Sequence, residues 1–419
     1  MKKLATIVLL LVSHLCFAQN TLTLQECYQL ALKQSERVAI EEADIKSSNA
    51  KYSQAIGSIL PKISFKGTEF LQDDSASASS SGVGTTFTRF SKPELKFNAK
   101  QPIFAGFREF NALKAMRAQK RGNEAEWEQA KRNLFLDVTK AFYSFLQLER
   151  DVAILKEIEK TLKNRLMELK ARTQLGKSRI SEQLATESDL AMQQATLSDV
   201  EGSSEQAKEI LYYFTGVSVD SLKDDLNMPK ELPEAPSLLK STSKRPDIKA
   251  AREARNEAKS LLSVEKGARF PSINVEANYY TYRVGFQENI KWDSLFSLDV
   301  PIFQGGQTRG KIQEAKIHLK QAELASQEKH RQVELEIKQS YNDFLTSQKQ
   351  VVALETAKAK AEKNFRVVEQ DYQLGLVNNL EVLATLKNLQ EIKREFNRTL
   401  AQAKVDYFAL KVATGEPLP

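Results

Sequence analysis

The feature that most constrains the fold is a unit that occurs twice in the chain. The segment QPIFAGFR at residues 101–108 matches VPIFQGGQ at 300–307, and QLGKSRISEQL at 174–184 matches QLGLVNNLEVL at 373–383. Each pair lies 199 residues apart. Two copies with a period near 200 residues indicate a gene duplication, because the units of a solenoid are only about 20–50 residues long. We therefore predict an internal two-fold sequence repeat.

The first half is longer than the second by a polar insertion. Upstream of these motifs, GSILPKISF at 57–65 matches GARFPSINV at 267–275, which lies 210 residues later. The 11 additional residues fall in a window that contains DDSASASSSGVGTT at 73–86. A small polar stretch without periodicity is typical of a surface loop.

The N-terminus indicates export. Lys2 and Lys3 precede an apolar run at residues 4–12, and small residues precede Gln19 at the spacing of a cleavage site. Removing a signal peptide at 1–18 lowers the formal net charge from +7 to +5, because two lysines leave with it. The mature chain then holds a single cysteine, Cys27, so we expect no internal disulfide.

Composition divides the rest of the chain at a linker. The segment at 217–246 carries four prolines and is predicted to be irregular. We expect a first structural repeat at 19–216, this inter-repeat linker at 217–246, and a second repeat at 247–419.

Charge and motifs exclude several classes of protein. The chain is basic, but its charges alternate in sign along residues 311–339, which is typical of a solvated helix surface rather than a nucleic-acid site. His318 and His330 are the only histidines after the signal peptide, and they predict no metal site. The sequence has no G-x-S-x-G motif or phosphate loop, so we predict neither an enzyme nor a cofactor.

Each repeat begins with helix and then changes to strand. Residues 23–57 and 247–267 have apolar positions three and four apart, which predicts helices and places Cys27 on an apolar stripe as a packed thiol. Alternation then predicts hairpins at 62–70 with 87–104 and at 272–284 with 292–303. In the second hairpin one face is apolar, with aromatic residues near the strand ends, and the other is polar. A lipid-facing hairpin and a soluble hairpin both fit this alternation.

The strands imply a closed assembly if they meet lipid. The mature sequence has no run of about 18 apolar residues, so a membrane crossing would need a barrel. Two hairpins supply four strands with two open edges, which lipid cannot satisfy. Oligomerisation follows from this alternative.

Long helices follow each hairpin. From Gly106 to Gln174 the chain has no proline over 69 residues, which is about 100 Å of helix. A turn glycine, Gly176 or Gly375, then precedes a helix that returns to Thr215 or Thr414. Heptad spacing predicts coiled-coil hairpins. The heptad positions are Leu148, Val152, Leu155, Leu162, Leu166 and Leu169 in the first half, with Glu159 as an exception, and Val351, Leu354, Ala361, Phe365 and Val368 in the second.

Both halves carry the same residues where strand is predicted to become helix. We expect Pro102 and Pro301 to end strand pairing, because proline has no N–H group. Glycine permits unusual backbone angles, and phenylalanine would fill the junction. The residues of these strand-to-helix junctions are Pro102, Phe104, Gly106, Pro301, Phe303 and Gly305.

This order of elements, with P-x-F-x-G before each long helix and LG at each helix tip, resembles the outer-membrane efflux protein family of TolC-like channels over essentially the whole mature chain. The resemblance implies an α+β membrane protein and a homotrimer. Four strands per chain would form one β-barrel in the outer-membrane lipid, continued by a long α-helical coiled-coil barrel in the periplasm.

The resemblance also implies a passive function. The protein would be the exit duct of a tripartite efflux or type I secretion system, beneath which a periplasmic adaptor (membrane fusion) protein and an inner-membrane pump of RND or ABC type dock. A periplasmic coiled-coil adaptor protein is the alternative, but it would carry one helical hairpin flanked by small soluble β domains.

Functional positions at the helix tips follow from the resemblance. The adaptor-docking tips are Leu175, Gly176, Lys177, Leu374, Gly375 and Leu376, and the residues of the periplasmic aperture are Tyr372, Glu381, Ser181 and Glu182. The family's gating arginine falls on Val377 and its second carboxylate on Ala384, so Lys177 or Arg179 would have to supply the cation. We hypothesise that Glu381 from three chains forms an acidic ring that favours cations.

Overall fold

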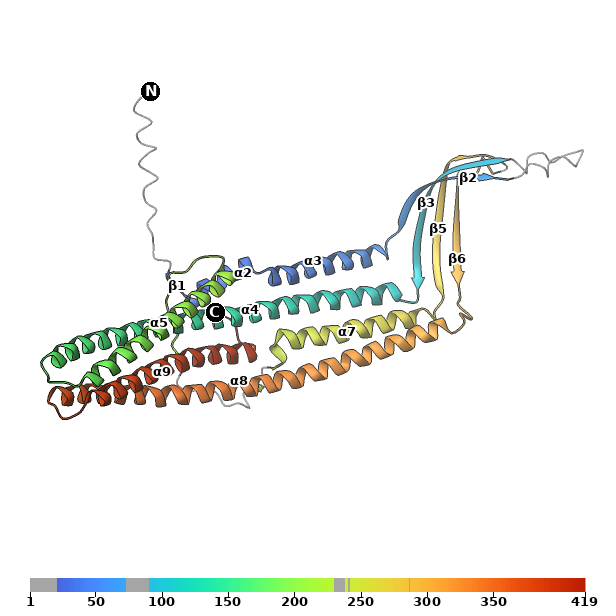
Figure 1. Ribbon diagram of the computed structural model, residues 1–419. Coiled ribbons are helices and arrows are strands. Elements are labelled where there is room, and N and C mark those ends of the chain that lie inside the picture. The colour runs from blue at the N-terminus through green and yellow to red at the C-terminus, as the bar shows by residue number, and fades with distance from the viewer. Residues whose placement is uncertain (1–20, 73–89, 230–237, 240–241, 286, 419) are drawn as a thin grey trace, which may run out of the picture. The chain divides into compact units, whose positions relative to one another are not determined.

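The computed structural model describes residues 21–72, 90–229, 238–239, 242–285 and 287–418 (Figure 1). The predicted signal peptide and the polar stretch at 73–86 lie outside these residues. The chain divides into two compact units. The helical unit comprises Met1–Ala39, Glu128–Arg245 and Arg331–Pro419, and the sheet unit comprises Ile40–Trp127 and Pro246–His330.

Helices make up most of the described chain, and the order helix, two strands, two helices occurs twice. The helices are α2 (Leu24–Gln34), α3 (Glu36–Gly57), α4 (Arg108–Gln174), α5 (Ile180–Thr215), η2 (Thr242–Lys244), α7 (Pro246–Gly267), α8 (Gln307–Gln373) and α9 (Asn379–Ala413). The strands are β1 (Thr21–Leu22), β2 (Lys62–Leu71), β3 (Ser91–Ala105), β4 (Ser221–Leu222), β5 (Ser272–Arg283) and β6 (Trp292–Asp299). Within the described ranges, every helix is too short or too polar to cross a lipid bilayer.

The predicted helix at 23–57 is wrong in one respect, because the structure has two helices there. Ser35 separates α2 from α3 with an extended backbone, at φ −72° and ψ 110°. Its hydroxyl accepts a hydrogen bond from the Val38 N–H at 3.4 Å, as an N-cap residue of a new helix does. The apolar spacing continues across the break and therefore does not reveal it.

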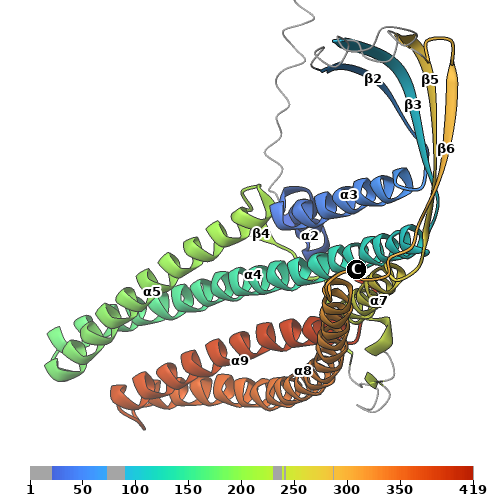
Figure 2. The same cartoon turned by 90° about the vertical axis from the view of Figure 1, so that its right-hand side faces the viewer.

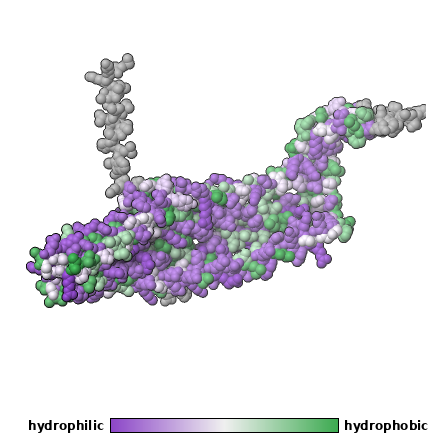
Figure 3. Space-filling view, viewed as in Figure 1, coloured by the Kyte–Doolittle hydropathy of each residue, from purple (hydrophilic) through white to green (hydrophobic). Residues whose placement is uncertain are grey.

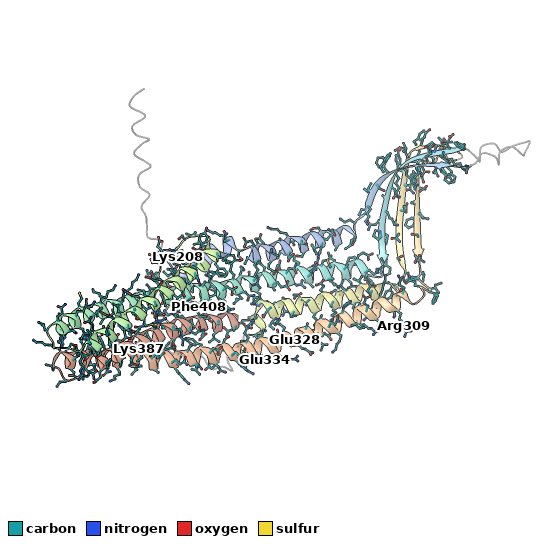
Figure 4. All side chains as sticks on the ribbon, viewed as in Figure 1. Lys208, Arg309, Glu328, Glu334, Lys387 and Phe408 are labelled. Carbon is teal, nitrogen blue, oxygen red and sulfur yellow. The ribbon has the colours of Figure 1, made fainter. Side chains whose placement is uncertain are left out.

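An aromatic cluster forms the core of the helical unit. The ring of Phe135 on α4 contacts Tyr28 on α2 at 5.1 Å and Phe408 on α9 at 5.3 Å between centroids, and Phe408 is labelled in Figure 4. Cys27 on α2 is fully buried, and burial raises the pKa of its thiol to about 12. The prediction of a packed rather than a reactive thiol is confirmed.

The four long strands form one antiparallel sheet in the order β2-β3-β5-β6, so β2 and β6 are its edges (Figure 2). Both predicted hairpins are present, and they meet through β3 and β5. Asn98 lies directly opposite Asn278, and Ala99 lies opposite Ala277.

The two faces of the sheet differ as predicted. On the polar face, Asn98 Nδ2 donates to Glu276 Oε1 at 2.7 Å and to Asn278 Oδ1 at 2.8 Å. Asp293 accepts from Asn278 Nδ2 at 2.8 Å and from the Tyr280 hydroxyl at 2.7 Å. The opposite face exposes large apolar side chains, namely Ile63, Phe65, Phe97, Tyr279, Trp292, Phe296 and Leu298. A single sheet thus presents one hydrogen-bonded face and one apolar face.

Polar contacts hold the helices of the sheet unit together. Arg121 on α4 donates twice to Glu253 Oε2 on α7, at 2.7 and 3.0 Å, and the Arg117 guanidinium on α4 donates to the Tyr52 hydroxyl on α3 at 3.0 Å. Figure 3 shows hydrophilic residues over much of the visible surface of these helices. This surface agrees with the alternating charges of the sequence.

The strand-to-helix junctions correct two expectations. Pro102 does not end pairing, because β3 continues to Ala105 and Pro102 lies opposite Asn274 at a register shift. The pairing of β2 with β3 has already ended at Lys100, and proline is tolerated at such a one-sided, irregular position. Phe303 does not fill a junction within the described chain, since its side chain is 87% exposed. In the second half, β6 ends at Asp299, before Pro301.

Two glycines make a backbone-to-backbone contact at the first junction. Gly106 has φ +67°, and a Cβ there would lie 2.2 Å from the Gly267 carbonyl oxygen. A Cβ on Gly267 would lie 2.6 Å from the Gly106 carbonyl oxygen and 2.5 Å from Arg108 Cγ. Neither position has room for a side chain.

We expect Gly267→Ala to lower the free energy of unfolding by about 1–3 kcal/mol, because the added methyl group overlaps backbone atoms that cannot rotate away. Urea unfolding in detergent measures the change. Gly202→Ala on α5 is the control, because a Cβ there meets no atom within 4 Å among the described residues. Equal stability of the two variants would contradict the close contact.

Candidate functional site at the helix tips

Both helical hairpins of the helical unit turn through the same backbone motif. After α4, Gly176 N–H donates to the Thr173 carbonyl at 3.0 Å and Lys177 N–H to the Arg172 carbonyl at 2.8 Å. After α8, Gly375 and Leu376 repeat the two bonds at 3.0 and 2.9 Å. This is the Schellman arrangement, and it requires the left-handed backbone that Gly176 and Gly375 adopt at φ 69° and 76°.

The tips expose apolar side chains to solvent. Leu175, Leu374 and Leu376 are all more than 70% exposed, and Lys177 is also exposed. A Schellman turn often covers such a residue with an apolar contact to its own helix. Here the leucines project from the turns, so the tips offer apolar surface for contact.

The second tip begins α9 with a reciprocal cap. Asn378 Oδ1 accepts from the Glu381 N–H at 3.0 Å, and Asn378 Nδ2 donates to Glu381 Oε1 at 3.1 Å. Glu381 is exposed in the first helical turn, where the helix dipole favours a carboxylate. Glu381 therefore has a capping role, whatever further role its charge has.

The first tip begins α5 with a different set of bonds. The Ser178 hydroxyl donates to Glu182 Oε2 at 2.5 Å, and the Glu182 N–H donates to the Arg179 carbonyl at 3.0 Å. Ser181 is exposed, whereas Glu182 is half-buried. Of the two aperture residues expected on this turn, Glu182 is thus the one held in place.

Tyr372 is buried between two arginines of α4. Its side chain is 5% exposed, and the guanidinium carbons of Arg165 and Arg172 lie 4.4 and 5.2 Å from its ring centroid. The buried Arg165 also pairs with Glu168 at 3.3 Å and with Glu369 on α8 at 3.5 Å. The cations at Tyr372 are therefore Arg165 and Arg172, which the sequence analysis did not name.

A second polar contact joins the two tips. Asn379, the first residue of α9, is fully buried, and its Nδ2 donates to the Thr186 hydroxyl of α5 at 3.0 Å. The same atom lies 3.5 Å from the Glu182 carbonyl oxygen. The structure thus joins the Tyr372 turn to α4 and the Glu182 turn to α9, while the side chain of Glu381 bonds to Asn378 on its own turn.

Arg165 and Tyr372 lie at heptad positions of α4 and α8, so a heptad search that includes polar residues could have revealed their contact. The buried residues of this part of α4 follow alternating steps of four and three, and they are Asp151, Leu155, Ile158, Leu162, Arg165 and Leu169. The predicted positions Val152 and Leu166 are only half-buried. On α8 the predicted seam continues from Phe365 and Val368 by a step of four to Tyr372. Arg165 and Tyr372 are thus seam residues that an apolar heptad search passes over.

One carboxylate in the described part of the linker contacts both helical hairpins. Asp224 accepts from Lys404 Nζ on α9 at 2.5 Å, from Arg150 on α4 at 3.4 Å and from the Tyr143 hydroxyl at 3.4 Å. The prediction of an irregular linker misses this anchor, because the sequence does not show which residues Asp224 contacts.

Comparison with known proteins identifies a family match over both halves. The family described as Outer membrane efflux protein matches residues 27–217 and 239–416. The chain is 20% identical to Outer membrane protein TolC of Escherichia coli strain K12 over 94% of this chain and 81% of that protein. It is 26% identical to Cation efflux system protein CusC of Escherichia coli O6:H1 over 67% of this chain, a match that spans 64% of CusC.

Solved structures have the same fold at low identity. The chain aligns with a crystal structure of CusC at a TM-score of 0.80, over 94% of this chain and 92% of CusC, with 16% identity. It aligns with the outer membrane protein VceC of Vibrio cholerae at a TM-score of 0.81, over 94% of this chain and 96% of VceC, with 18% identity.

The buried tyrosine predicts a pH dependence. Burial raises the pKa of Tyr372, although Arg172 and Arg165 act in the opposite direction. The stabilisation from the neutral ring is therefore complete below the unfolded pKa of about 10 and is lost as the pH rises through the higher folded pKa. We expect the urea midpoint to fall more steeply above about pH 10 in the parent protein than in Tyr372→Phe.

The exposed Tyr212 provides the control, since Tyr212→Phe removes the same hydroxyl from a solvated site and should leave the slope unchanged. Parallel curves for the parent protein and Tyr372→Phe would show that Tyr372 is not buried in solution.

Proposed function

The chain belongs to the outer membrane efflux protein family, and from this premise we propose that it is the passive outer-membrane exit duct of a tripartite efflux or type I secretion system. The observation that carries the proposal is the family match across both halves of the chain. The family consists of channel proteins, so we assign this chain no catalytic step and no cofactor. Energy for transport would come from the pump.

The sheet supports a membrane-embedded barrel built by a homotrimer. Within the described residues, β2 pairs with β3 and β6 pairs with β5, which leaves one edge of each outer strand open. Lipid offers no hydrogen bonds to such edges, so the sheet must close with other copies. Four strands from each of three copies would place Phe296 and Leu298 toward lipid and Asn98 and Asp293 toward a wet lumen.

The internal duplication and its boundaries are part of the same proposal. We assign the repeats to 19–216 and 247–419, with 217–246 between them. Helices α4 and α8 support this assignment, because each has 67 residues and their first residues lie 199 positions apart. Each compact unit contains segments of both repeats, so the repeats describe ancestry whereas the units describe packing.

The helical hairpins would form the periplasmic tube and its docking end. Exposed Leu175, Leu374 and Leu376 suit an adaptor (membrane fusion) protein that binds apolar turns, and an inner-membrane pump of RND or ABC type would lie beneath. Tyr372, Glu381, Ser181 and Glu182 would surround the aperture. The alternative of a periplasmic adaptor is disfavoured because the described chain has two helical hairpins and one four-stranded sheet.

Cell fractionation followed by native mass spectrometry tests the proposal. We expect the protein in the outer-membrane fraction as a species of three chains. A soluble or inner-membrane product, or a monomer in mild detergent, would contradict the duct.

We expect Glu381→Gln to reduce the cation selectivity of single channels in planar bilayers, because three carboxylates would leave one ring. Glutamine keeps the acceptor that Asn378 uses, so the cap of α9 is preserved. Glu391→Gln removes the same charge about 15 Å further along α9 and is the control. Unchanged reversal potentials in Glu381→Gln would contradict the acidic ring.

A further inference from the structure

Within one copy of the chain, no described backbone angle or contact requires a glycine at position 57. Gly57 ends α3, it is absent from the residues with positive φ, and a Cβ there would meet no atom within 4 Å among the described residues. Glycine lowers helix stability relative to alanine, and one reason for a glycine at a helix end is the close approach of another backbone. Its counterpart Gly267 ends α7, and there Gly106 provides the close approach.

The counterparts are fixed by the bounds of the elements. α3 and α7 end at residues 57 and 267, and β2 and β5 begin at 62 and 272, so both pairs differ by 210. α4 and α8 begin at 108 and 307 and end at 174 and 373, a difference of 199. Gly305 is thereby the counterpart of Gly106. It also has positive φ, at 58°, and no described atom within 4 Å of its Cβ position.

Among the described residues, nothing covers the connection around Gly305 in the way that the first junction is covered. Ile302 and Phe303 are 95% and 87% exposed, next to the first turn of α8, where Arg309 is labelled in Figure 4. The counterpart Phe104 is half-buried, lies opposite Ile273 of β5, and contacts the Phe107 ring at 5.1 Å. The element that covers the first junction consists of β5 and the end of α7. The equivalent elements of the first repeat are β2 and the end of α3.

The register of β3 with β5 can be transferred to β6 and a second β2. Lys100 lies opposite Glu276, and these residues correspond to Asp299 and Lys66. Asn98 lies opposite Asn278, which corresponds to Ser297 opposite Thr68. The transferred register therefore reverses the two charges but keeps them opposite in sign.

Charges on the sheet favour this register. Within one copy, Lys66 lies opposite Lys96, and like charges at such positions are destabilising. Lys96 has Glu94 as its partner at 2.9 Å, whereas neither Lys66 nor Asp299 has an ion-pair partner within 4.0 Å among the described residues. Asp299 of a second copy would supply the missing negative charge.

We propose that a second copy of this chain completes the junction: its α3 end at Gly57 packs against Gly305, and its β2 edge pairs with β6 with Lys66 opposite Asp299. The partner is this chain itself, because its own β2 supplies the matching charges, the open edge and the glycine. The inference rests on the proposed oligomeric channel and specifies how neighbouring copies meet.

Cysteine cross-linking tests the register. In Lys66→Cys/Asp299→Cys, mild oxidation or a short thiol cross-linker should convert most of the protein into covalent dimers and trimers on denaturing, non-reducing gels. Lys62→Cys/Asp299→Cys is the matched control, since position 62 lies four residues, about 13 Å, along the strand. Cys27 is fully buried and will not react in the folded protein.

The outcomes separate this inference from the proposed function. Native trimers that cross-link through the control pair, or through neither pair, would overturn the register while leaving the duct intact. A protein that forms no oligomer would overturn the duct itself.

The glycine contact has its own test. We expect Gly57→Ala to reduce the fraction of trimer on native gels at least severalfold, although alanine favours the α3 helix itself. Gly202→Ala, an open helical glycine, should assemble like the parent protein. Circular dichroism checks that the Gly57→Ala chain keeps its helices. Unimpaired assembly of a folded Gly57→Ala protein would contradict the contact.

Discussion

Backbone hydrogen bonding at the sheet edges is the constraint on which the rest of this protein depends. β3 and β5 have neighbours on both sides, whereas β2 and β6 each have one within the described residues. The polar face satisfies its own side chains through Asn98, Asn278 and Asp293, so side chains do not create the need for a partner. In the proposed membrane-embedded barrel, unpaired backbone groups beside an apolar face would create that need, because lipid cannot replace them. The proposed duct depends on closing these edges.

Polar residues in the helical seam fix how the hairpins meet. Buried Asp151 on α4 accepts from Asn397 of α9 at 2.8 Å and lies 3.5 Å from Arg394, and Arg165 meets Glu369 and Tyr372 of α8. Leaving the buried Asp151 or Arg165 without its partners would be destabilising, whereas the intact ion pairs, whose partners Arg394 and Glu369 are partly exposed, contribute little net stability. A polar residue in a heptad seam instead specifies which helices pair and in which register. The tip is therefore positioned by groups that an apolar pattern cannot represent.

Prediction from sequence succeeded where one local pattern determined the outcome. Periodicity located α4, α5, α8 and α9, and alternation located both hairpins and the two faces of the sheet. It failed where a single residue competed with a pattern. Ser35 breaks a helix because its hydroxyl caps the next one, and Pro102 stays within β3 because a register shift at the end of one-sided pairing tolerates it. The aperture residues came from resemblance, and the arginines at Tyr372 came only from the structure.

The sequence by itself determined the doubled order of elements, the apolar and polar faces of the strands, and the glycine turns at the helix tips. These are properties of spacing and of backbone conformation, which neighbouring residues control. Only the tertiary structure decided that β3 pairs with β5, that Arg165 and Arg172 enclose Tyr372, and that Gly106 meets Gly267. These contacts join residues that are far apart in the chain. Their geometry depends on how whole elements pack, which no local pattern encodes.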